Sequence, residues 1–239
     1  MNTSSKNFLI YGASKGLGKA IIQSIPESND VVYGVSRSTP SKMPNLNWIE
    51  ADLSSSETSV HKIKEAINNN KIDVLIYNVG IWETDAFTEN YDFEKISSLE
   101  INQMISTNIN TCIQSLQALI KNLRASDNAK VILIGSTWGV ENHNGKELIF
   151  SASKFALRGV AESLREILRN DLIGVSILNL GYLATEYEID VPVDQILKET
   201  DHSLIPLEDV IQAIKFIIST SNGTCVKEIL MPAMKDTNV

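Results

Sequence analysis

The chain has 239 residues, 43% of them hydrophobic, and a formal net charge of −8 at pH 7, with an isoelectric point near 5.0. This length and composition fit one large globular domain with a substantial core and exclude a disordered chain. Because acidic residues predominate and no basic run exists that could follow a phosphate backbone, we expect no nucleic-acid partner. No apolar run approaches the length of a membrane-spanning helix, so we expect no membrane partner either.

The two cysteines, Cys112 and Cys225, stand far apart in the sequence. Two isolated cysteines make neither a disulfide framework nor a metal cluster, and we expect no metal site. The N-terminal stretch Met1–Lys6 is polar and lacks the apolar core of a signal peptide. Together these features predict a cytoplasmic protein.

Short apolar runs alternate with helical patterns along the whole chain. In chain order they predict a strand at Asn7–Tyr11, a helix at Leu17–Ile25, strands at Val31–Val35 and Leu46–Ala51, a helix at Glu57–Asn69, a strand at Ile72–Tyr77, a helix at Leu99–Leu123, a strand at Lys130–Ile134, a helix at Ser151–Asn170, a strand at Val175–Leu180, a helix at Leu207–Ser219 and a strand at Glu228–Met231. Continuous apolar strands separated by helices are typical of a parallel sheet covered on both faces. With right-handed crossovers, the pattern predicts a single α/β Rossmann-fold domain over residues 1–239, with a doubly wound parallel sheet of about seven strands.

A glycine-rich turn lies between the first strand and the first helix. Glycines at this point let the backbone approach a pyrophosphate, which then rests on the N-terminus of the following helix. The location in the first strand-to-helix turn therefore predicts a bound dinucleotide. The residues expected to contact it are Gly12, Ser14, Lys15, Gly16, Leu17 and Gly18.

The end of the second strand distinguishes the two nicotinamide dinucleotides. A carboxylate about 20 residues after the glycines would hold the ribose 2′-hydroxyl of NAD and repel the 2′-phosphate of NADP. The chain instead reads Val35-Ser36-Arg37-Ser38, where Arg37 offers a guanidinium fork suited to phosphate and Ser36 adds a hydroxyl donor. Lys15 in the glycine turn is expected to approach the same phosphate, so these residues favour NADP(H).

The GxxxGxG spacing of the glycine turn resembles that of the short-chain dehydrogenase/reductase family, and further motifs follow in family order along essentially the whole chain. The resemblance implies adenine contacts from Asp52 and Leu53, ribose contacts from Asn78 and Gly80, and a nicotinamide amide contact from Thr185. It also makes residues 182–205 the substrate loop. Without it, the acidic and irregular segment Ala184–Leu204 would be taken for an ordinary surface excursion rather than a lid.

The same resemblance implies four catalytic positions. Lys154 matches the lysine that binds the nicotinamide ribose and lowers the pKa of a catalytic tyrosine, and Asn108 matches the asparagine that holds a proton-relay water. Ser136 matches the serine that orients the substrate oxygen, and we favour it over Thr137, on which the family spacing counted back from position 150 falls. The fourth position should be the tyrosine of Tyr-x-x-x-Lys, and this chain has Phe150-Ser151-Ala152-Ser153-Lys154.

Phenylalanine at position 150 keeps the ring of a tyrosine and loses its proton. Positions i and i+4 share a helix face, so Lys154 would favour a phenolate at position 150, but Phe150 itself cannot act as a general acid or base. Three interpretations remain open. The tyrosine was deliberately replaced to trap a complex; the phenylalanine is natural and His143 or Tyr182 supplies a proton for other chemistry; or the protein is an NADP(H)-binding pseudoenzyme or regulator.

The activity implied by the resemblance is that of an NADP(H)-dependent oxidoreductase, which transfers a hydride between the cofactor and a carbonyl or alcohol. The alternatives are non-redox chemistry on the same scaffold, such as an isomerase or dehydratase, and a cofactor-binding regulator. The expected pocket segments, Ile81–Tyr91, Trp138–Ile149 and Tyr182–Ile205, carry mixed aromatic, acidic and amide groups, which favours a small polar metabolite as partner. Trp82 and Trp138 form either an aromatic wall there or part of the core.

An oligomer is also implied by the resemblance. The two long helices of this family often pair across a twofold axis into a four-helix interface. We therefore expect Leu99–Leu123 and Ser151–Asn170 to build a homodimer or homotetramer. The second of these helices carries apolar residues in more than one direction, so one side can face the sheet and another a partner.

Overall fold

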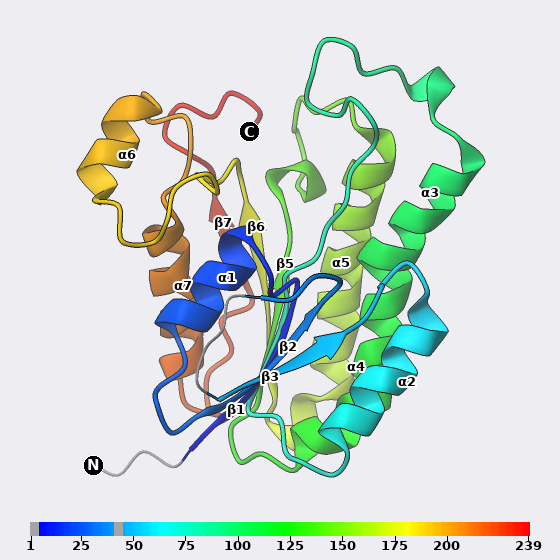
Figure 1. Ribbon diagram of the computed structural model, residues 1–239, viewed down its shortest axis with the longest axis vertical. Coiled ribbons are helices and arrows are strands. Elements are labelled where there is room, and N and C mark those ends of the chain that lie inside the picture. The colour runs from blue at the N-terminus through cyan, green and yellow to red at the C-terminus, as the bar shows by residue number, and fades with distance from the viewer. Residues whose placement is uncertain (1–4, 41–44) are drawn as a thin grey trace.

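A computed structural model describes residues 5–40 and 45–239, so most of the polar N-terminal stretch Met1–Lys6 lies outside the described residues. Within these ranges, seven parallel strands form one sheet in the order β3-β2-β1-β4-β5-β6-β7 (Figure 1). The strand order reverses between β1 and β4, which confirms the predicted doubly wound α/β fold. The strands are β1 (Asn7–Tyr11), β2 (Val31–Ser36), β3 (Leu46–Glu50), β4 (Val74–Tyr77), β5 (Lys130–Ile134), β6 (Gly174–Leu180) and β7 (Glu228–Met231).

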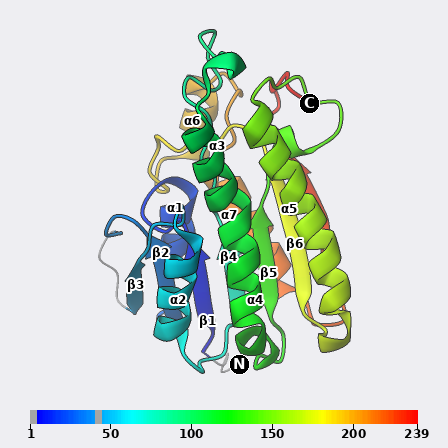
Figure 2. The same cartoon turned by 90° about the vertical axis from the view of Figure 1, so that its right-hand side faces the viewer.

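Helices cover both faces of the sheet (Figures 1 and 2). One face carries α1 (Gly16–Ser24) and α7 (Leu207–Ser219), and the other carries α2 (Ser56–Ile67), α4 (Thr111–Arg124) and α5 (Leu148–Ile167). The sheet separates two apolar clusters, because successive residues of a strand point to opposite faces. The central strands β1, β4, β5 and β6 are therefore largely buried on both faces, whereas the edge strands β3 and β7 are partly exposed.

The helix predicted at Leu99–Leu123 is not one regular α-helix. It consists of α3 (Ser98–Ile105), the π-helical turn η2 (Ser106–Asn110) and α4. A π turn adds a residue to the helix and is frequent at functional sites. Here it contains Asn108, which is fully buried. The propensities of the sequence fit a continuous helix, and only the contacts of Asn108 explain the interruption.

The segment Ala184–Leu204, expected to be irregular, contains the short helix α6 (Val193–Glu199). Pro192 at its N-terminal boundary has φ −57°, which is compatible with helix entry, and Asp194 lies in its first turn, where a negative charge is favoured. The remaining short elements are the 3-10 turns η1 (Phe93–Lys95), η3 (Thr137–Gly139) and η4 (Arg169–Asp171).

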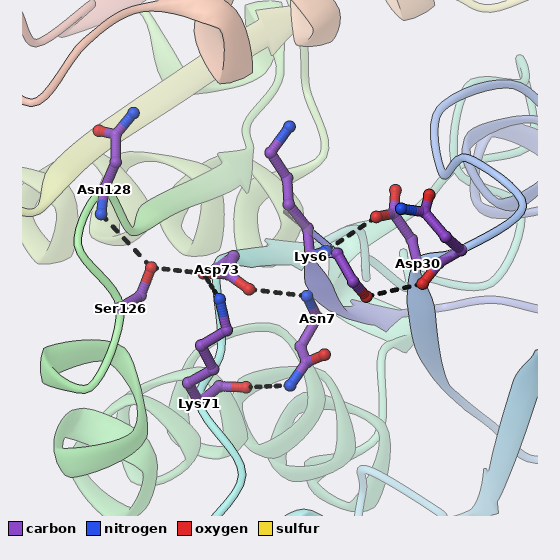
Figure 3. A network of polar contacts seen from close by, with 9 residues as sticks. Lys6, Asn7, Asp30, Lys71, Asp73, Ser126 and Asn128 are labelled. Atoms are coloured by element: carbon purple, nitrogen blue, oxygen red, sulfur yellow. Dashed lines mark hydrogen bonds and ion pairs between the residues drawn. The ribbon is translucent and has the colours of Figure 1, made fainter. Parts of the chain in front are cut away.

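Polar side chains brace the amino-terminal edge of the sheet (Figure 3). The Asp73 carboxylate accepts hydrogen bonds from three groups: Asn7 N–H at 2.8 Å, Lys71 Nζ at 3.0 Å and Ser126 Oγ at 2.6 Å. Asp30 likewise accepts a backbone amide at 2.8 Å. Both carboxylates are buried, and buried carboxylates need such donors to be stable. This edge is closed by internal bonds, so the opposite, carboxyl edge is where a ligand is expected.

None of the helices in residues 5–40 and 45–239 combines the length and the apolar character that crossing a membrane requires.

Candidate active site

The glycine turn lies at the carboxyl end of β1, next to the point where the strand order reverses. Gly12 has φ +74°, and a Cβ there would collide with the carbonyl oxygen of Asn78. A Cβ on Gly18 would collide with the carbonyl of Gly12. Both positions therefore require glycine because strand, turn and helix approach one another too closely for a side chain.

The first turn of α1 offers backbone donors. Lys15 occupies the N-cap position and is extended, and no side chain within the described ranges caps this end. The first amides of a helix have no acceptor inside it, and the helix dipole makes this end favourable for an anion. This geometry fits the pyrophosphate expected on Gly16, Leu17 and Gly18, with Ser14 half-buried just before them.

Arg37 is brought to the glycine turn by backbone hydrogen bonds. The amides of Gly12 and Ala13 donate to the carbonyl of Val35 at 2.9 and 3.1 Å, so the carboxyl ends of β1 and β2 are joined there. Arg37 and Lys15 are both exposed on this edge. Two cationic side chains therefore flank the turn, as the interpretation of a 2′-phosphate site requires.

Ser36 differs from the expected free donor. Its side chain is buried, its hydroxyl donates to the carbonyl of Ser38 at 2.7 Å, and its Oγ accepts from Trp48 Nε1 at 3.2 Å. The proton of Ser36 is thus already used within the chain. Sequence reasoning also missed Glu50, an exposed carboxylate that pairs in register with Ser36 on the neighbouring strand β3.

The other expected cofactor residues lie along the same edge. Asn78 Nδ2 donates to the carbonyl of Gly12 at 3.5 Å. A Cβ on Gly16 would lie 3.4 Å from the methyl group of Thr185, so the loop after β6 touches the glycine turn. Asp52 is exposed, whereas Leu53 is buried. The topology therefore gathers segments from four strand ends, and their sequence order alone does not show these contacts.

Lys154 is the buried cation of the site. Its Nζ donates to the carbonyls of Ile134 at 3.0 Å and Val79 at 3.5 Å, and it lies 5.4 Å from the centre of the Phe150 ring. A Cβ on Gly80 would approach this Nζ to 3.0 Å. Burial lowers the pKa of Lys154 to about 8, although the nearby Cys112 opposes the shift. The carbonyls at the ends of β4 and β5 thus hold an ammonium beneath the ring at position 150.

Asn108 joins three segments. Its Oδ1 accepts from the amide of Ile81 at 2.9 Å, and its Nδ2 donates to the carbonyl of Ile81 at 2.8 Å and to Ser153 Oγ at 3.0 Å. The π turn points the amide group inward to make these bonds. They fix the start of the loop after β4 against α5, the helix that carries Phe150 and Lys154.

The two candidate hydroxyls after β5 differ in their partners. Ser136 Oγ accepts from the amide of Trp138 at 3.2 Å and caps η3. Thr137 is fully buried, and its Oγ1 has no hydrogen-bond partner among the described residues. Both remain candidates to orient a substrate oxygen, and the capping bond leaves the hydroxyl proton of Ser136 free to donate.

Phe150 belongs to a cluster of five aromatic side chains. Phe87 lies at the centre, with ring centroids 5.7 Å from Trp82, 5.2 Å from Trp138, 5.5 Å from Phe150 and 5.7 Å from Tyr182. All four contacts are edge-on, with interplanar angles of 64–86°. Trp138 is buried in this cluster, while Trp82 is exposed over 56% of its surface. Trp138 therefore belongs to a buried core cluster, whereas Trp82 borders the same cluster from its exposed side.

Two buried carboxylates, which sequence reasoning did not single out, hold this region together. Glu83 Oε1 accepts from the amides of Ile149 at 2.7 Å and Phe150 at 3.2 Å, at the N-terminus of α5. Glu147 accepts from the amide of Phe87 at 2.9 Å and from Trp138 Nε1 at 2.6 Å. Each acid has polar or charged residues on one side in the sequence, so no local signal indicated its burial.

The similarity of this chain to known proteins agrees with the geometry. The model of the family described as short chain dehydrogenase matches residues 6–195. The chain belongs to the short-chain dehydrogenase family. Members of this family are oxidoreductases that use a nicotinamide cofactor, so the coarse class of the expected activity is established.

Two curated relatives and one solved structure illustrate the range of this short-chain dehydrogenase's similarity. A 3-ketodihydrosphingosine reductase from Bacteroides thetaiotaomicron is 30% identical over 65% of this chain and 56% of its own length. Carbonyl reductase family member 4 from Xenopus laevis is 27% identical over 90% of this chain and 92% of its own. A tyrosine-to-phenylalanine variant of ElxO with NADPH bound superposes with a TM-score of 0.75 at 19% identity, covering 95% of this chain and 97% of its own.

His143 of this short-chain dehydrogenase is tied to α5. Its Nδ1 accepts from the amide of Gly145 at 3.1 Å, which assigns the proton to Nε2 of the neutral ring. Nε2 lies 3.0 Å from Ser151 Oγ, and that hydroxyl donates to the carbonyl of Trp138 at 2.9 Å. Because Nε2 of His143 carries the ring proton, no base lies next to the Ser151 hydroxyl. The pair of His143 and Ser151 therefore does not form an activated nucleophile.

The buried ammonium of Lys154 should make stability depend on pH. Because its folded pKa of about 8 lies below the ordinary 10.5, the unfolded chain binds the extra proton between these values. The cost of Lys154 to folding is therefore complete below pH 8 and is relieved as the pH rises toward 10.5. The free energy of unfolding of Lys154→Met, minus that of the unchanged protein, should fall by about 2–3 kcal/mol between pH 7 and pH 10.

Urea unfolding at the two pH values measures this difference. Lys146→Met is the matched control, since Lys146 is exposed beside the same helix, and its difference should stay constant. An equal difference at pH 7 and pH 10 for Lys154→Met would contradict the assignment.

Proposed function

We propose that this protein is an NADP(H)-dependent oxidoreductase that acts on a carbonyl or alcohol group of a small molecule. The observation that carries the proposal is the convergence at Gly80, where a Cβ would meet both Lys154 Nζ at 3.0 Å and the Phe150 ring at 3.8 Å. The backbone of the turn after β4 therefore lies directly beside both the ammonium and the ring. The glycine turn and the uncapped amides of α1 lie on the same edge of the sheet.

The charges beside the glycine turn support NADP(H) as the cofactor. Arg37 and Lys15 would pair with a 2′-phosphate, and the α1 amides with the pyrophosphate. The structures of ElxO with NADP and of its variant with NADPH, which share the fold, are consistent with this assignment. When bound, the cofactor supplies the hydride. The chain's own residues must position the substrate and handle the proton.

Phe150 stands, in our proposal, where the family has its catalytic tyrosine. Lys154 would bind the cofactor ribose with an ammonium that burial already makes acidic, and Ser136 would donate to the substrate oxygen. Neither expected substitute for the phenol, Tyr182 or His143, is a good proton donor. Burial, with the nearby carboxylates of Glu147 and Asp236, raises the pKa of Tyr182 to about 12, so this phenol holds its proton too tightly to serve as an efficient acid.

A second candidate function is NADP(H) binding without redox turnover. The observation that favours it is the aromatic packing of the Phe150 ring, which contacts Phe87 and Trp82 edge-on and carries no hydroxyl of its own. His143 donates its ring proton toward Ser151 and is therefore already occupied. A site with cofactor-binding groups but no proton donor at position 150 would bind the nucleotide and reduce nothing at an appreciable rate.

The cofactor assignment predicts a strong preference for NADPH over NADH. Arg37→Asp should remove an attractive charge and add a repulsive one, which shifts the preference toward NADH. Titration of each nucleotide, followed by cofactor fluorescence, measures both affinities. Lys121→Asp, a charge reversal at the end of α4 that faces away from the carboxyl edge, should leave the preference unchanged. Equal affinities of the unchanged protein for NADPH and NADH would overturn the assignment.

The catalytic assignment predicts that the chain with Phe150 reduces carbonyls very slowly while still binding NADPH. Phe150→Tyr should restore a phenol next to Lys154 and raise the rate by about 10²–10⁴-fold, as expected for a general acid. A panel of aldehydes and ketones, with NADPH consumption as the readout, compares the two proteins. If the Phe150 protein reduces a substrate as fast as the tyrosine variant, another group supplies the proton. If neither consumes NADPH, the binding-protein candidate is favoured.

We also propose that the protein is a homodimer or homotetramer built on α4 and α5. On α5, Leu157 and Leu164 pack into the core, whereas Phe155 and Ile167 are 38% and 61% exposed; Ile113 on α4 is 46% exposed. Light scattering at micromolar concentration should give a mass of at least two chains, and Phe155→Asp should lower it. A monomeric mass for the unchanged protein would contradict this arrangement.

A further inference from the structure

Phe87 occupies the space that faces position 150. Its ring makes edge-on contacts with four aromatic side chains at 5.2–5.7 Å, and one of the four is Phe150 itself. We propose that this space is a binding subsite for an aromatic ring of the substrate, and that Phe87 fills it as a removable plug. The proposal rests on the proposed function for the reaction next to the subsite, but the subsite itself needs no cofactor.

The geometry of the contacts points to a flat ring as the ligand. Aromatic rings prefer edge-to-face contacts at these distances, because the positive edge of one ring meets the negative face of the next. Trp82, Trp138 and Tyr182 together with Phe150 offer four such contacts to one central ring. An aliphatic group of the same size would gain the apolar burial but not these oriented contacts. The aromatic lining thus narrows the expected small polar metabolite to a carbonyl compound or alcohol that carries an aromatic ring.

The backbone that carries the plug is strained. Asp85 and Phe87 have φ +58° and +64°, a left-handed conformation that residues other than glycine rarely adopt. Two consecutive tight turns enforce it, since Ala86 N–H donates to the carbonyl of Glu83 and Thr88 N–H to that of Asp85. Strained residues of this kind persist only where surrounding contacts hold them, and they concentrate at switch regions and ligand clamps.

One carboxylate holds the plug in place. Glu147 Oε1 accepts the amide proton of Phe87 at 2.9 Å, and its Oε2 accepts the indole proton of Trp138 at 2.6 Å. Glu147 therefore keeps Trp138 fixed as a wall whether or not Phe87 is present. A substrate ring in the place of Phe87 would contact Phe150, whose own ring lies 5.4 Å from Lys154 Nζ. A carbonyl attached to the substrate ring would thus lie near Phe150 and Lys154, the proposed reacting position.

Removal of the plug should turn the filled space into a measurable site. Apolar cavities created by truncation stay dry and bind small aromatic molecules. Phe87→Ala, without cofactor, should therefore bind benzyl alcohol at least about tenfold more tightly than the unchanged protein does. Tryptophan fluorescence reports binding, because Trp82 and Trp138 line the space, and ligand-observed NMR provides an independent measurement.

Two comparisons make the test specific. Cyclohexylmethanol, an aliphatic alcohol of similar size, should bind Phe87→Ala more weakly than benzyl alcohol. Phe93→Ala removes an exposed ring from the same segment and should leave the affinity for benzyl alcohol unchanged. If Phe87→Ala does not fold, Phe87→Leu keeps part of the apolar volume without the ring and should show a smaller gain of the same sign.

The outcomes separate this proposal from the proposed function. Equal affinity of the unchanged protein and the Phe87 variants for benzyl alcohol would overturn the subsite, as would equal affinity for the aliphatic alcohol. NADPH titration of the same variants tests the cofactor site independently, since Phe87 lies outside the glycine turn. Binding of benzyl alcohol without binding of NADPH would support the subsite and contradict the proposed oxidoreductase. Binding of NADPH without binding of benzyl alcohol would support the cofactor site and contradict the subsite.

Discussion

The buried ammonium of Lys154 is the constraint on which the rest of the site depends. A cation without water must have its protons accepted, and here backbone carbonyls at the ends of β4 and β5 accept them. These bonds tie α5 to the carboxyl edge of the sheet at one fixed height. A Cβ on Gly80 would lie 3.0 Å from the same Nζ, so the turn after β4 also passes close to this charge. The helix, the turn and the ring at residue 150 therefore meet at one buried cation.

Two buried carboxylates lie at the N-terminus of α5. Glu83 and Glu147 are 1% and 5% exposed, and no cation pairs with either of them within the described ranges. Instead, backbone amides and the indole of Trp138 donate hydrogen bonds to the two carboxylates, at a helix end whose dipole favours negative charge. Buried groups of both charges in this region are thus stabilised by hydrogen bonds to the protein rather than by water.

The two sides of the site differ in how they are attached. The cofactor side depends on close backbone contacts between strand ends. At Gly12 and Gly18 these contacts leave no space for a side chain. The substrate side depends on side chains from three loops, with Phe87 at their centre. The loop after β6 also contacts α1, through the ion pair of Lys19 with Glu188 at 2.6 Å. This exposed ion pair places the loop after β6 against the helix whose first turn is expected to hold the pyrophosphate.

The sequence by itself determined the fold class, a doubly wound parallel sheet of about seven strands, and the glycine turn, because apolar runs and glycine spacing are local properties. It also determined that Phe150 and Lys154 share a helix face, since that follows from a spacing of four residues. Only the tertiary structure decided that a π turn at Asn108 interrupts the helix and that Phe87 fills the space next to Phe150. It also decided that the Ser36 hydroxyl donates its hydrogen bond to the carbonyl of Ser38. Each of these depends on a contact between segments far apart in the chain, and local patterns carry no information about which distant group will be the partner.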